Sequence, residues 1–226
     1  MSTTISKTEN LVEMLVGIVE RMPVDSVLTQ HAVSWEEYEE LIEAVGDASG
    51  LLISYDSGRL QIMTLSQRHE RYSTLIGRIV GQLSLLLRIK VLFYGSVTIK
   101  KQRKQKGVEP DACFYVQNAT LVGTKDEIDF NVDPPPDVVV KVDLHHESLS
   151  KFPIYADLGV PEIWRYDGKA LTMHHLRDGE YVASEASLSL PVLTSGVLTE
   201  FLARSPKQDQ YDILLAFEEW LKTQQQ

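Results

Sequence analysis

The sequence is nearly free of cysteine, because Cys113 is the only one among 226 residues. A single thiol cannot form a disulfide within the chain, and it cannot build a zinc site from several thiolates. Both exclusions fit a protein of a reducing compartment. Cys113 follows Asp111 at strand spacing, and the interpretation that we favour for it is a packed thiol.

Long apolar runs are also missing. No stretch approaches the roughly 20 apolar residues that cross a membrane, and Met1–Lys7 lacks the basic-then-apolar pattern of a secretory signal. Hydrophobic residues still make up 43% of the chain, which is enough for one substantial core. We therefore expect a soluble, cytoplasmic protein with no membrane partner. The expected organisation is a single domain, 1–226, with an N-terminal helical extension (1–30), a core (31–204) and a C-terminal helix (205–226).

Positive charge is scarce, since 22 Lys and Arg face 32 Asp and Glu and the net charge is −10. This balance weighs against nonspecific coating of nucleic acid, which requires a positive surface. One short segment is the exception, and it is either a site of phosphate contact or the solvated tip of a hairpin. Its basic residues are Lys100, Lys101, Arg103, Lys104 and Lys106, and the first four are our candidate substrate-binding residues.

The apolar periodicity predicts a mixed α/β fold. Ser34 and Glu37 have the spacing of a capping box and open a short acidic helix that ends at Gly46. A helix between the last two core strands predicts a parallel crossover. The expected helices are an N-terminal one, the capped one, a long one over 67–88, one from 149 to 159 and a last one; the expected strands are 51–55, 59–64, 92–99, 108–116, 137–144, 162–166, 171–176 and 180–182.

Two charges interrupt the valine-rich strand over 137–144. A period of two residues places Lys141 and Asp143 on the same face of this strand. Burying a charge costs several kcal/mol unless another group pairs with it. Glu109 and Asp111 repeat the arrangement on the preceding strand. Carboxylates and an amine that converge from neighbouring strands are typical of a metal-assisted hydrolase.

A set of ordered segments over roughly residues 30 to 205 resembles a known family. The chain is similar to the PD-(D/E)XK nuclease superfamily and, more closely, to the restriction endonuclease-like family of bacterial proteins. The resemblance implies a restriction endonuclease-like fold, a mixed sheet flanked by helices. The segments that carry it are Val33–Glu37, Gly58–Met63, Glu109–Asp111, Asp133–Val140 and Lys151–Asp167.

The resemblance also implies a reaction, in which water activated at Mg²⁺ hydrolyses a DNA phosphodiester. Asp111 corresponds to the aspartate that binds the metal. Lys151 corresponds to the lysine that orients the water or stabilises the phosphorane charge. The family has a second acidic ligand at the position of Lys141, and this chain departs from the family there.

Lys141 puts the metal site in question. Two unit charges about 4 Å apart interact by about 4 kcal/mol at an effective dielectric near 20, so replacing a −1 ligand of a +2 ion by a +1 neighbour changes the energy by up to about 16 kcal/mol. A metal would then need another carboxylate beside Asp111, and the candidates are Asp143, Glu109 and Glu70. Alternatively, Lys141 pairs with Asp111 and Asp143, and the site is degenerate.

The function that we expect is a Mg²⁺-dependent DNA endonuclease, either active through a relocated acid or degenerate. In the active form the catalytic residues are Asp111, Lys141, Asp143 and Lys151, and DNA is the partner. The alternative is a non-catalytic module that binds DNA or protein on the same fold. The sequence leaves the oligomeric state open, a homodimer included.

Overall fold

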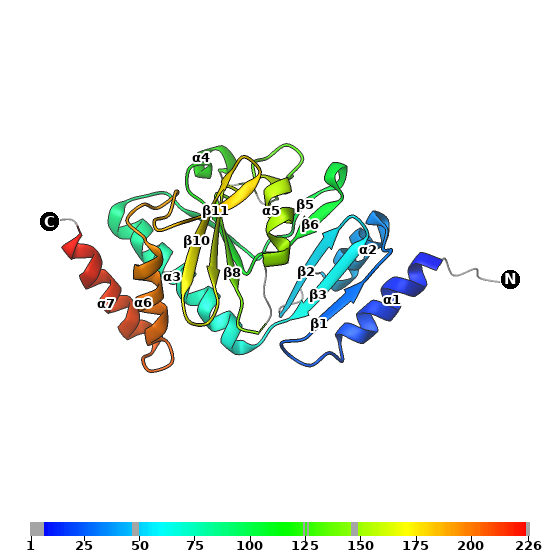
Figure 1. Cartoon of the computed structure of the whole chain (residues 1–226), viewed down its shortest axis with the longest axis horizontal. Coiled ribbons are helices and arrows are strands. Elements are labelled where there is room, and N and C mark those ends of the chain that lie inside the picture. The colour runs from blue at the N-terminus through cyan, green and yellow to red at the C-terminus, as the bar shows by residue number, and fades with distance from the viewer. Residues whose placement is uncertain (1–6, 47–49, 124, 126, 146–148, 225–226) are drawn as a thin grey trace.

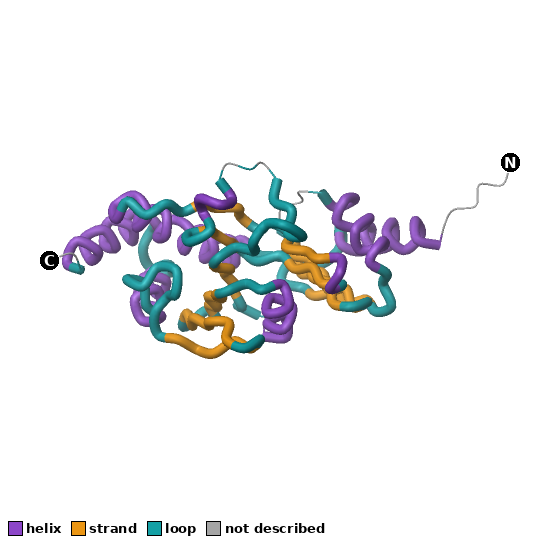
Figure 2. The backbone as a smooth tube through the Cα atoms, turned by 90° about the horizontal axis from the view of Figure 1, so that it is seen from above, coloured by secondary structure: helices purple, strands orange, loops and turns teal. Residues whose placement is uncertain are grey.

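The computed structural model describes residues 7–46, 50–123, 125, 127–145 and 149–224. Two β-sheets form the centre of the described chain, with helices at both ends (Figures 1 and 2). None of the helices in the described ranges is long and apolar enough to cross a membrane. The helices are α1 (Lys7–Val19), α2 (Trp35–Val45), α3 (Gln67–Leu87), α4 (Ala119–Val122), α5 (Phe152–Leu158), α6 (Ser195–Arg204) and α7 (Gln210–Thr223), with 3-10 turns at η1 (Gln102–Lys104) and η2 (Leu149–Lys151).

The first sheet is antiparallel and has the order β1-β3-β2-β6-β5. Alternate residues of β2 and β3 pack under α1 and α2, around the stacked rings of Tyr38 and Tyr55. The predicted capping box of α2 is confirmed, because Ser34 and Glu37 bond to each other's backbone N–H groups and Gly46 ends the helix. The strands are β1 (Val27–Gln30), β2 (Leu51–Asp56), β3 (Arg59–Thr64), β5 (Ile99–Lys101) and β6 (Lys106–Val108).

The second sheet has the order β11-β10-β9-β8-β7-β4. Val138, Val140 and Val142 face a core formed with α3, α6 and α7, whereas Val139 faces α5. β8 and β9 are parallel and α5 connects them, which confirms the predicted crossover. The strands are β4 (Leu92–Gly95), β7 (Ala112–Tyr115), β8 (Val138–Val142), β9 (Glu162–Tyr166), β10 (Leu171–Arg177) and β11 (Glu180–Ser184).

Two of the predicted strands are wrong in extent. The segment 92–99 divides into β4 and β5, and the segment 108–116 divides into β6 and β7, with each half in a different sheet. A bulge and the positive φ of Gly95 end β4, and Pro110, which has no N–H to donate to a ladder, lies between β6 and β7. The chain therefore crosses between the sheets at Glu109–Asp111. The short strand β1 and the helix α6 were not predicted either.

Candidate functional site

The crossing segment places Asp111 beside the central strand β8. The backbone N–H of Asp111 donates to the carbonyl of Val140 at 3.0 Å, and the next residue, Ala112, is paired with Val140 in the antiparallel ladder between β7 and β8. Asp111 and Lys141 therefore meet across neighbouring strands, as the sequence pattern predicted. The fold brings them together because the chain leaves the first sheet at Glu109 and enters the second at Ala112.

Both carboxylate oxygens of Asp111 lie close to nitrogen atoms of neighbouring residues. Lys141 Nζ lies 2.7 Å from Oδ2, which also accepts the backbone N–H of Val142 at 3.0 Å. His69 Nε2, from the first turn of α3, lies 2.9 Å from Oδ1. Burial raises the pKa of the Asp111 carboxyl, but Lys141 and His69 outweigh that effect and lower the pKa to about 2. Asp111 is therefore a carboxylate that the protein itself neutralises.

Lys141 lies beside Asp111, at the position where the resemblance implies a second acid. Its side chain is fully buried, and its ammonium has a long contact of 3.5 Å with the carbonyl of Glu109. An ammonium has three protons to donate and no lone pair, so it cannot be a metal ligand. The pair with Asp111 places a fixed positive charge where a metal would need a negative one.

The other two strand acids are engaged as well. Arg165 Nε, from β9, donates to Asp143 Oδ2 at 2.5 Å, and the Asp143 side chain is buried. Glu109 accepts the backbone N–H of Ile53 at 2.7 Å and the hydroxyl of Thr98 at 2.6 Å, so it connects the crossing segment to β2. Burial raises the pKa of Glu109, and these two hydrogen bonds oppose the increase.

Lys151 is the N-cap residue of α5 and is buried. Burial lowers the pKa of its amine to about 8, and the like charge of Lys141 contributes, while Asp111 and two further acids, Asp143 and Glu109, oppose the decrease. Lys151 therefore lies within electrostatic reach of the strand acids and of Lys141. The hydroxyl of Tyr155, one turn along α5, is buried and makes no hydrogen bond within the described residues.

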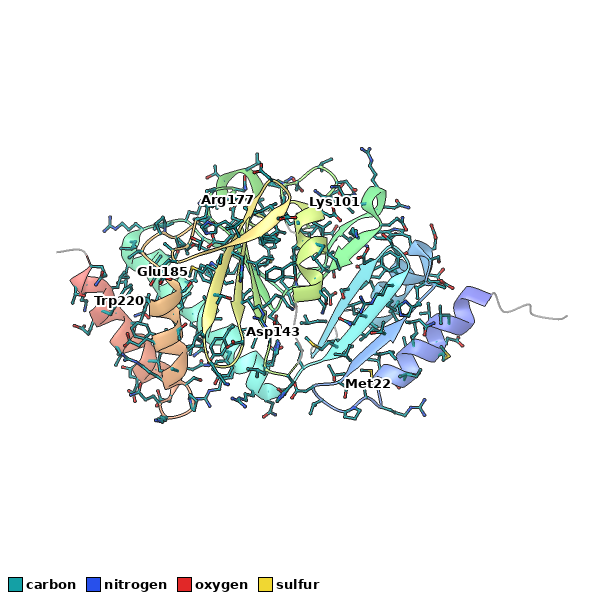
Figure 3. All side chains as sticks on the ribbon, viewed as in Figure 1. Met22, Lys101, Asp143, Arg177, Glu185 and Trp220 are labelled. Carbon is teal, nitrogen blue, oxygen red and sulfur yellow. The ribbon has the colours of Figure 1, made fainter. Side chains whose placement is uncertain are left out.

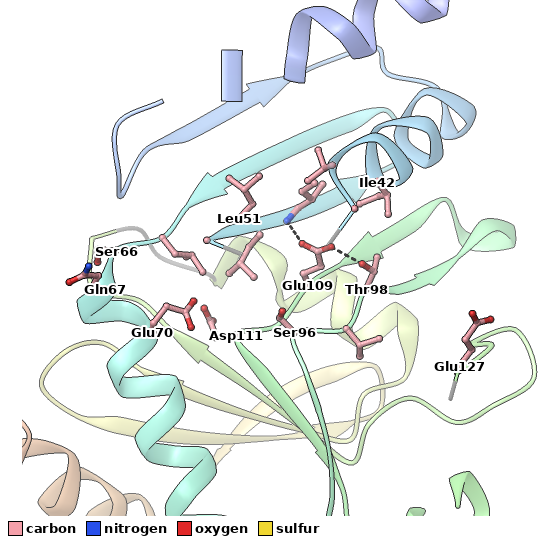
Figure 4. A pocket seen from close by; sticks show the side chains of 17 residues that line it. Ile42, Leu51, Ser66, Gln67, Glu70, Ser96, Thr98, Glu109, Asp111 and Glu127 are labelled. Atoms are coloured by element: carbon pink, nitrogen blue, oxygen red, sulfur yellow. Dashed lines mark hydrogen bonds between the residues drawn. The ribbon is translucent and has the colours of Figure 1, made fainter. Parts of the chain in front are cut away.

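A pocket of about 1060 Å³ opens beside this cluster (Figure 4). Its wall consists of the end of α2, the start of β2, the first turn of α3 and the crossing segment. Glu70, which is exposed on α3, and Asp111 lie toward the α3 end in Figure 4, and Glu127 lies toward the opposite end. The candidate acids Glu70, Glu109 and Asp111 therefore share one pocket, and Asp143 does not line it.

The basic segment does not line this pocket. Lys100 pairs with Glu39 of α2 at 2.6 Å, and Lys101 donates to the carbonyl of Leu158 at 3.2 Å. Arg103 and Lys104 are exposed in η1, at the tip of the β5–β6 hairpin. Figure 3 shows Lys101 in the upper part of the molecule, near this tip, and Asp143 lower down, near the middle of the view. Lys106 pairs with Asp56 and with Asp157, which lies 3.4 Å away.

The residues around Asp111 do not fit a Mg²⁺ site. Mg²⁺ requires oxygen ligands in near-octahedral geometry, usually carboxylates and waters. Among the residues that the structure describes, no group of three or more His, Cys, Asp and Glu side chains could hold a metal ion. Asp111 faces Lys141 and His69, and Asp143 faces Arg165. We therefore derive no step through a metal in this chain.

Sequence reasoning left two contacts of this cluster out of the candidate site. His69 is not among the predicted site residues, and its place at the start of the long helix is the signal that could have indicated its contact with Asp111. Arg165 gave no signal, because its role depends on the parallel pairing in which it lies opposite Lys141. That pairing brings its guanidinium to Asp143.

Comparison with known proteins identifies the family. The model of a family described as "Uma2: Putative restriction endonuclease" matches residues 35–202. No curated protein gives a significant match. One similar solved structure is the crystal structure of "a putative nuclease belonging to DUF820" from Anabaena variabilis, with 15% identity, a TM-score of 0.47, and coverage of 66% of this chain and 90% of that one. Because the family match spans most of the chain, the protein belongs to the Uma2 family of putative restriction endonucleases and has a restriction endonuclease-like fold.

Proposed function

We propose that this chain is a non-catalytic interaction module that uses a nuclease fold as its scaffold. The observation that carries the proposal is the contact of 2.7 Å between Lys141 Nζ and Asp111 Oδ2. Lys141 stands where the resemblance implies a second acidic ligand, and its ammonium neutralises the aspartate that would bind the metal. A fold by itself does not confer activity, so the charges at the site determine whether the chain can bind the metal that a nuclease needs.

Physical chemistry favours the ion pair over a bound metal. An ammonium about 4 Å from a divalent ion would be repelled by about 8 kcal/mol at an effective dielectric near 20. Removing Lys141 from Asp111 would also take from each buried charge its opposite charge in the ion pair, and breaking such a pair typically costs about 3–5 kcal/mol. The two effects act in the same direction, against Mg²⁺ and for the charge pair.

A second candidate function is a Mg²⁺-dependent endonuclease with a relocated acid. The observation that favours it is that Glu70, Glu109 and Asp111 line the same pocket. In this case Asp111 would have to exchange Lys141 for the metal, and Glu109 would have to give up its bonds to Ile53 and Thr98. Lys151 would be the amine left to orient water or to stabilise charge.

A cleavage assay with supercoiled plasmid DNA tests the proposal. We expect no Mg²⁺-dependent cleavage by the natural chain. Lys141→Glu returns a carboxylate beside Asp111, so this variant should be less stable than the natural chain in chelator. Added Mg²⁺ should stabilise it by about 1.4 kcal/mol at a concentration ten times the Kd, and its cleavage of DNA should rise.

Two further variants make the assay decisive. Lys141→Met removes the charge without adding a ligand, so Mg²⁺ should not stabilise it. Asp111→Ala in the Lys141→Glu background should abolish both the response to Mg²⁺ and the cleavage. Mg²⁺-dependent cleavage by the natural chain that is lost in Asp111→Ala would contradict the proposal and establish the relocated site.

A further inference from the structure

The pocket beside Asp111 has an apolar wall large enough for a ligand. Ile42 and Val45 of α2, Leu51 and Leu52 of the β2 region, and Val97 line it over a volume of about 1060 Å³. Pockets that bind ligands typically enclose about 300–1,000 Å³ and are lined mainly by apolar side chains with a few polar groups. The size and the apolar wall would accommodate several side chains of a partner.

The charged groups of this pocket are all acidic among the residues that the structure describes. Glu70, Glu109, Asp111 and Glu127 line it, and the described lining includes no Lys, Arg or His. Lys141 offsets the charge of Asp111 from behind, and hydrogen bonds hold Glu109 in place. Glu70 and Glu127 are exposed, and within the described residues neither forms an ion pair. These two carboxylates remain available to a cation.

The helix ends at the pocket do not reverse its negative charge. The C-terminal end of α2 reaches the pocket at Val45 and Gly46, and the N-terminal end of α3 reaches it at Ser66 and Gln67. The first is the negative end of a helix dipole and the second is the positive end, so their effects oppose each other. The carboxylates therefore determine the charge that the pocket prefers.

A negatively charged pocket discriminates against DNA. Phosphates brought beside Glu70 and Glu127 would meet like charges, and juxtaposed like charges suppress a wrong partner. A cationic side chain would meet opposite charge there, while apolar neighbours of that side chain could bury against Val45, Leu51 and Val97. The combination of charge and apolar surface matches a peptide better than it matches a bare polycation.

We infer that the pocket beside Asp111 is the docking site of a partner protein, and that the docked segment carries Lys or Arg among apolar residues. The inference rests on the proposed non-catalytic function and names the partner chemistry of that module. Glu70 and Glu127 bind the cationic side chains, and the ends of α2 and β2 bind the apolar ones.

Fluorescence anisotropy with the full chain and short labelled peptides tests the inference. The probe is a peptide of alternating Leu and Lys, which should bind saturably. A peptide of alternating Gly and Lys should bind more weakly because it lacks apolar side chains, and a peptide of alternating Leu and Glu should not bind. Glu70→Gln and Glu127→Gln should each weaken binding of the Leu–Lys peptide by about fivefold, as expected for a partly exposed ion pair.

The matched control is Glu219→Gln, which removes the same charge from an exposed site on α7. It should leave the affinity unchanged. Glu70→Lys should weaken binding of the Leu–Lys peptide further, and it should allow the Leu–Glu peptide to bind. Equal binding of the Gly–Lys peptide, or affinities that none of the pocket variants changes, would overturn the inference. The inference would also be overturned if a short DNA duplex bound more tightly than the Leu–Lys peptide and if the same variants weakened that binding.

This outcome is separable from the test of the proposed function. Absence of peptide binding together with absence of Mg²⁺-dependent cleavage overturns the docking site and leaves the non-catalytic assignment in place. Mg²⁺-dependent cleavage by the natural chain that is lost in Asp111→Ala overturns the non-catalytic assignment, whatever the result with the peptides.

Discussion

At the scale of single residues, the site depends on which charges are buried with a partner. Lys141 is fully buried and forms an ion pair with Asp111, whose carboxylate also contacts His69. Lys151 is buried nearby, but no hydrogen bond or ion pair of its amine occurs within the described residues. The cost of burying the charge is therefore offset differently for the two lysines. Lys141 has a carboxylate at 2.7 Å, whereas Lys151 has only longer-range attraction to acids.

The Lys151 amine predicts a dependence of stability on pH. Its pKa is about 8 in the folded chain and 10.5 ordinarily, so between these values the unfolded chain binds more protons than the folded one. The free energy of unfolding should therefore rise as the pH increases through this window, by up to about 3 kcal/mol from this residue. Below pH 8 this contribution is constant, since the amine is protonated in both states.

Lys151→Met should remove that rise. Denaturant unfolding at a pH below the window and at one near its top measures the free energy for each chain. The variant should be more stable than the natural chain at the lower pH, and the difference should shrink at the higher pH. The exposed Lys169→Met is the matched control, and it should shift stability equally at both pH values. A Lys151→Met difference that does not depend on pH would contradict the prediction.

At the scale of elements, the short strands around the crossing segment depend on close packing. Gly107 of β6 lies against Tyr38 of α2, and a Cβ built at Gly107 would be 2.1 Å from the Tyr38 hydroxyl oxygen. Tyr38 is completely buried and stacks on Tyr55 at 4.8 Å between ring centroids. The first sheet can therefore approach α2 this closely only because position 107 lacks a side chain.

Gly107→Ala should destabilise the protein by about 2 kcal/mol, because the added methyl forces Tyr38 out of its packed position. Thermal unfolding measures the loss. Gly77→Ala on α3 is the matched control, since nothing lies within 4 Å of a Cβ built there. It should stabilise α3 by up to about 1 kcal/mol, because alanine favours a helix interior. An unchanged melting temperature for Gly107→Ala would show that α2 and β6 separate without cost.

At the scale of the whole molecule, charge argues against broad binding of nucleic acid. The net charge is −10, and most of the basic segment is paired internally, through Glu39, Asp56 and the carbonyl of Leu158. Arg103 and Lys104, at the exposed tip, form no ion pair within the described residues, and they are the remaining candidates for phosphate contact. The segment lies away from Asp143 in Figure 3.

We expect the basic tip to be an ordinary solvated surface. The double substitution Arg103→Gln with Lys104→Gln should leave the salt dependence of DNA affinity unchanged, as should the control pair Lys169→Gln with Arg177→Gln. Titration of a DNA duplex at several salt concentrations measures the slope. A decrease of about two units in the slope for the tip variant alone would show that both side chains contact phosphates.

The sequence by itself determined the elements whose signals are local. The capping box predicted α2, the apolar stripe predicted α3, and the run from Glu162 to Tyr166 predicted β9, because helix caps and periodic burial involve residues a few positions apart. It also showed the departure at Lys141, which is visible as soon as the resemblance is drawn. The residue pattern predicted that Asp111 and Lys141 converge, and the resemblance added Lys151, which lies within electrostatic reach of both.

Only the tertiary structure decided how those charges are satisfied. Periodicity could not show that 92–99 and 108–116 each divide between two sheets, because a strand's partner is set by residues far away in the chain. The same is true of the bonds that hold Glu109 to Ile53 and of the contact between Arg165 and Asp143. The sequence does not show whether a charged side chain has a partner. The partner is decided when strands that are distant in the sequence come together in the fold.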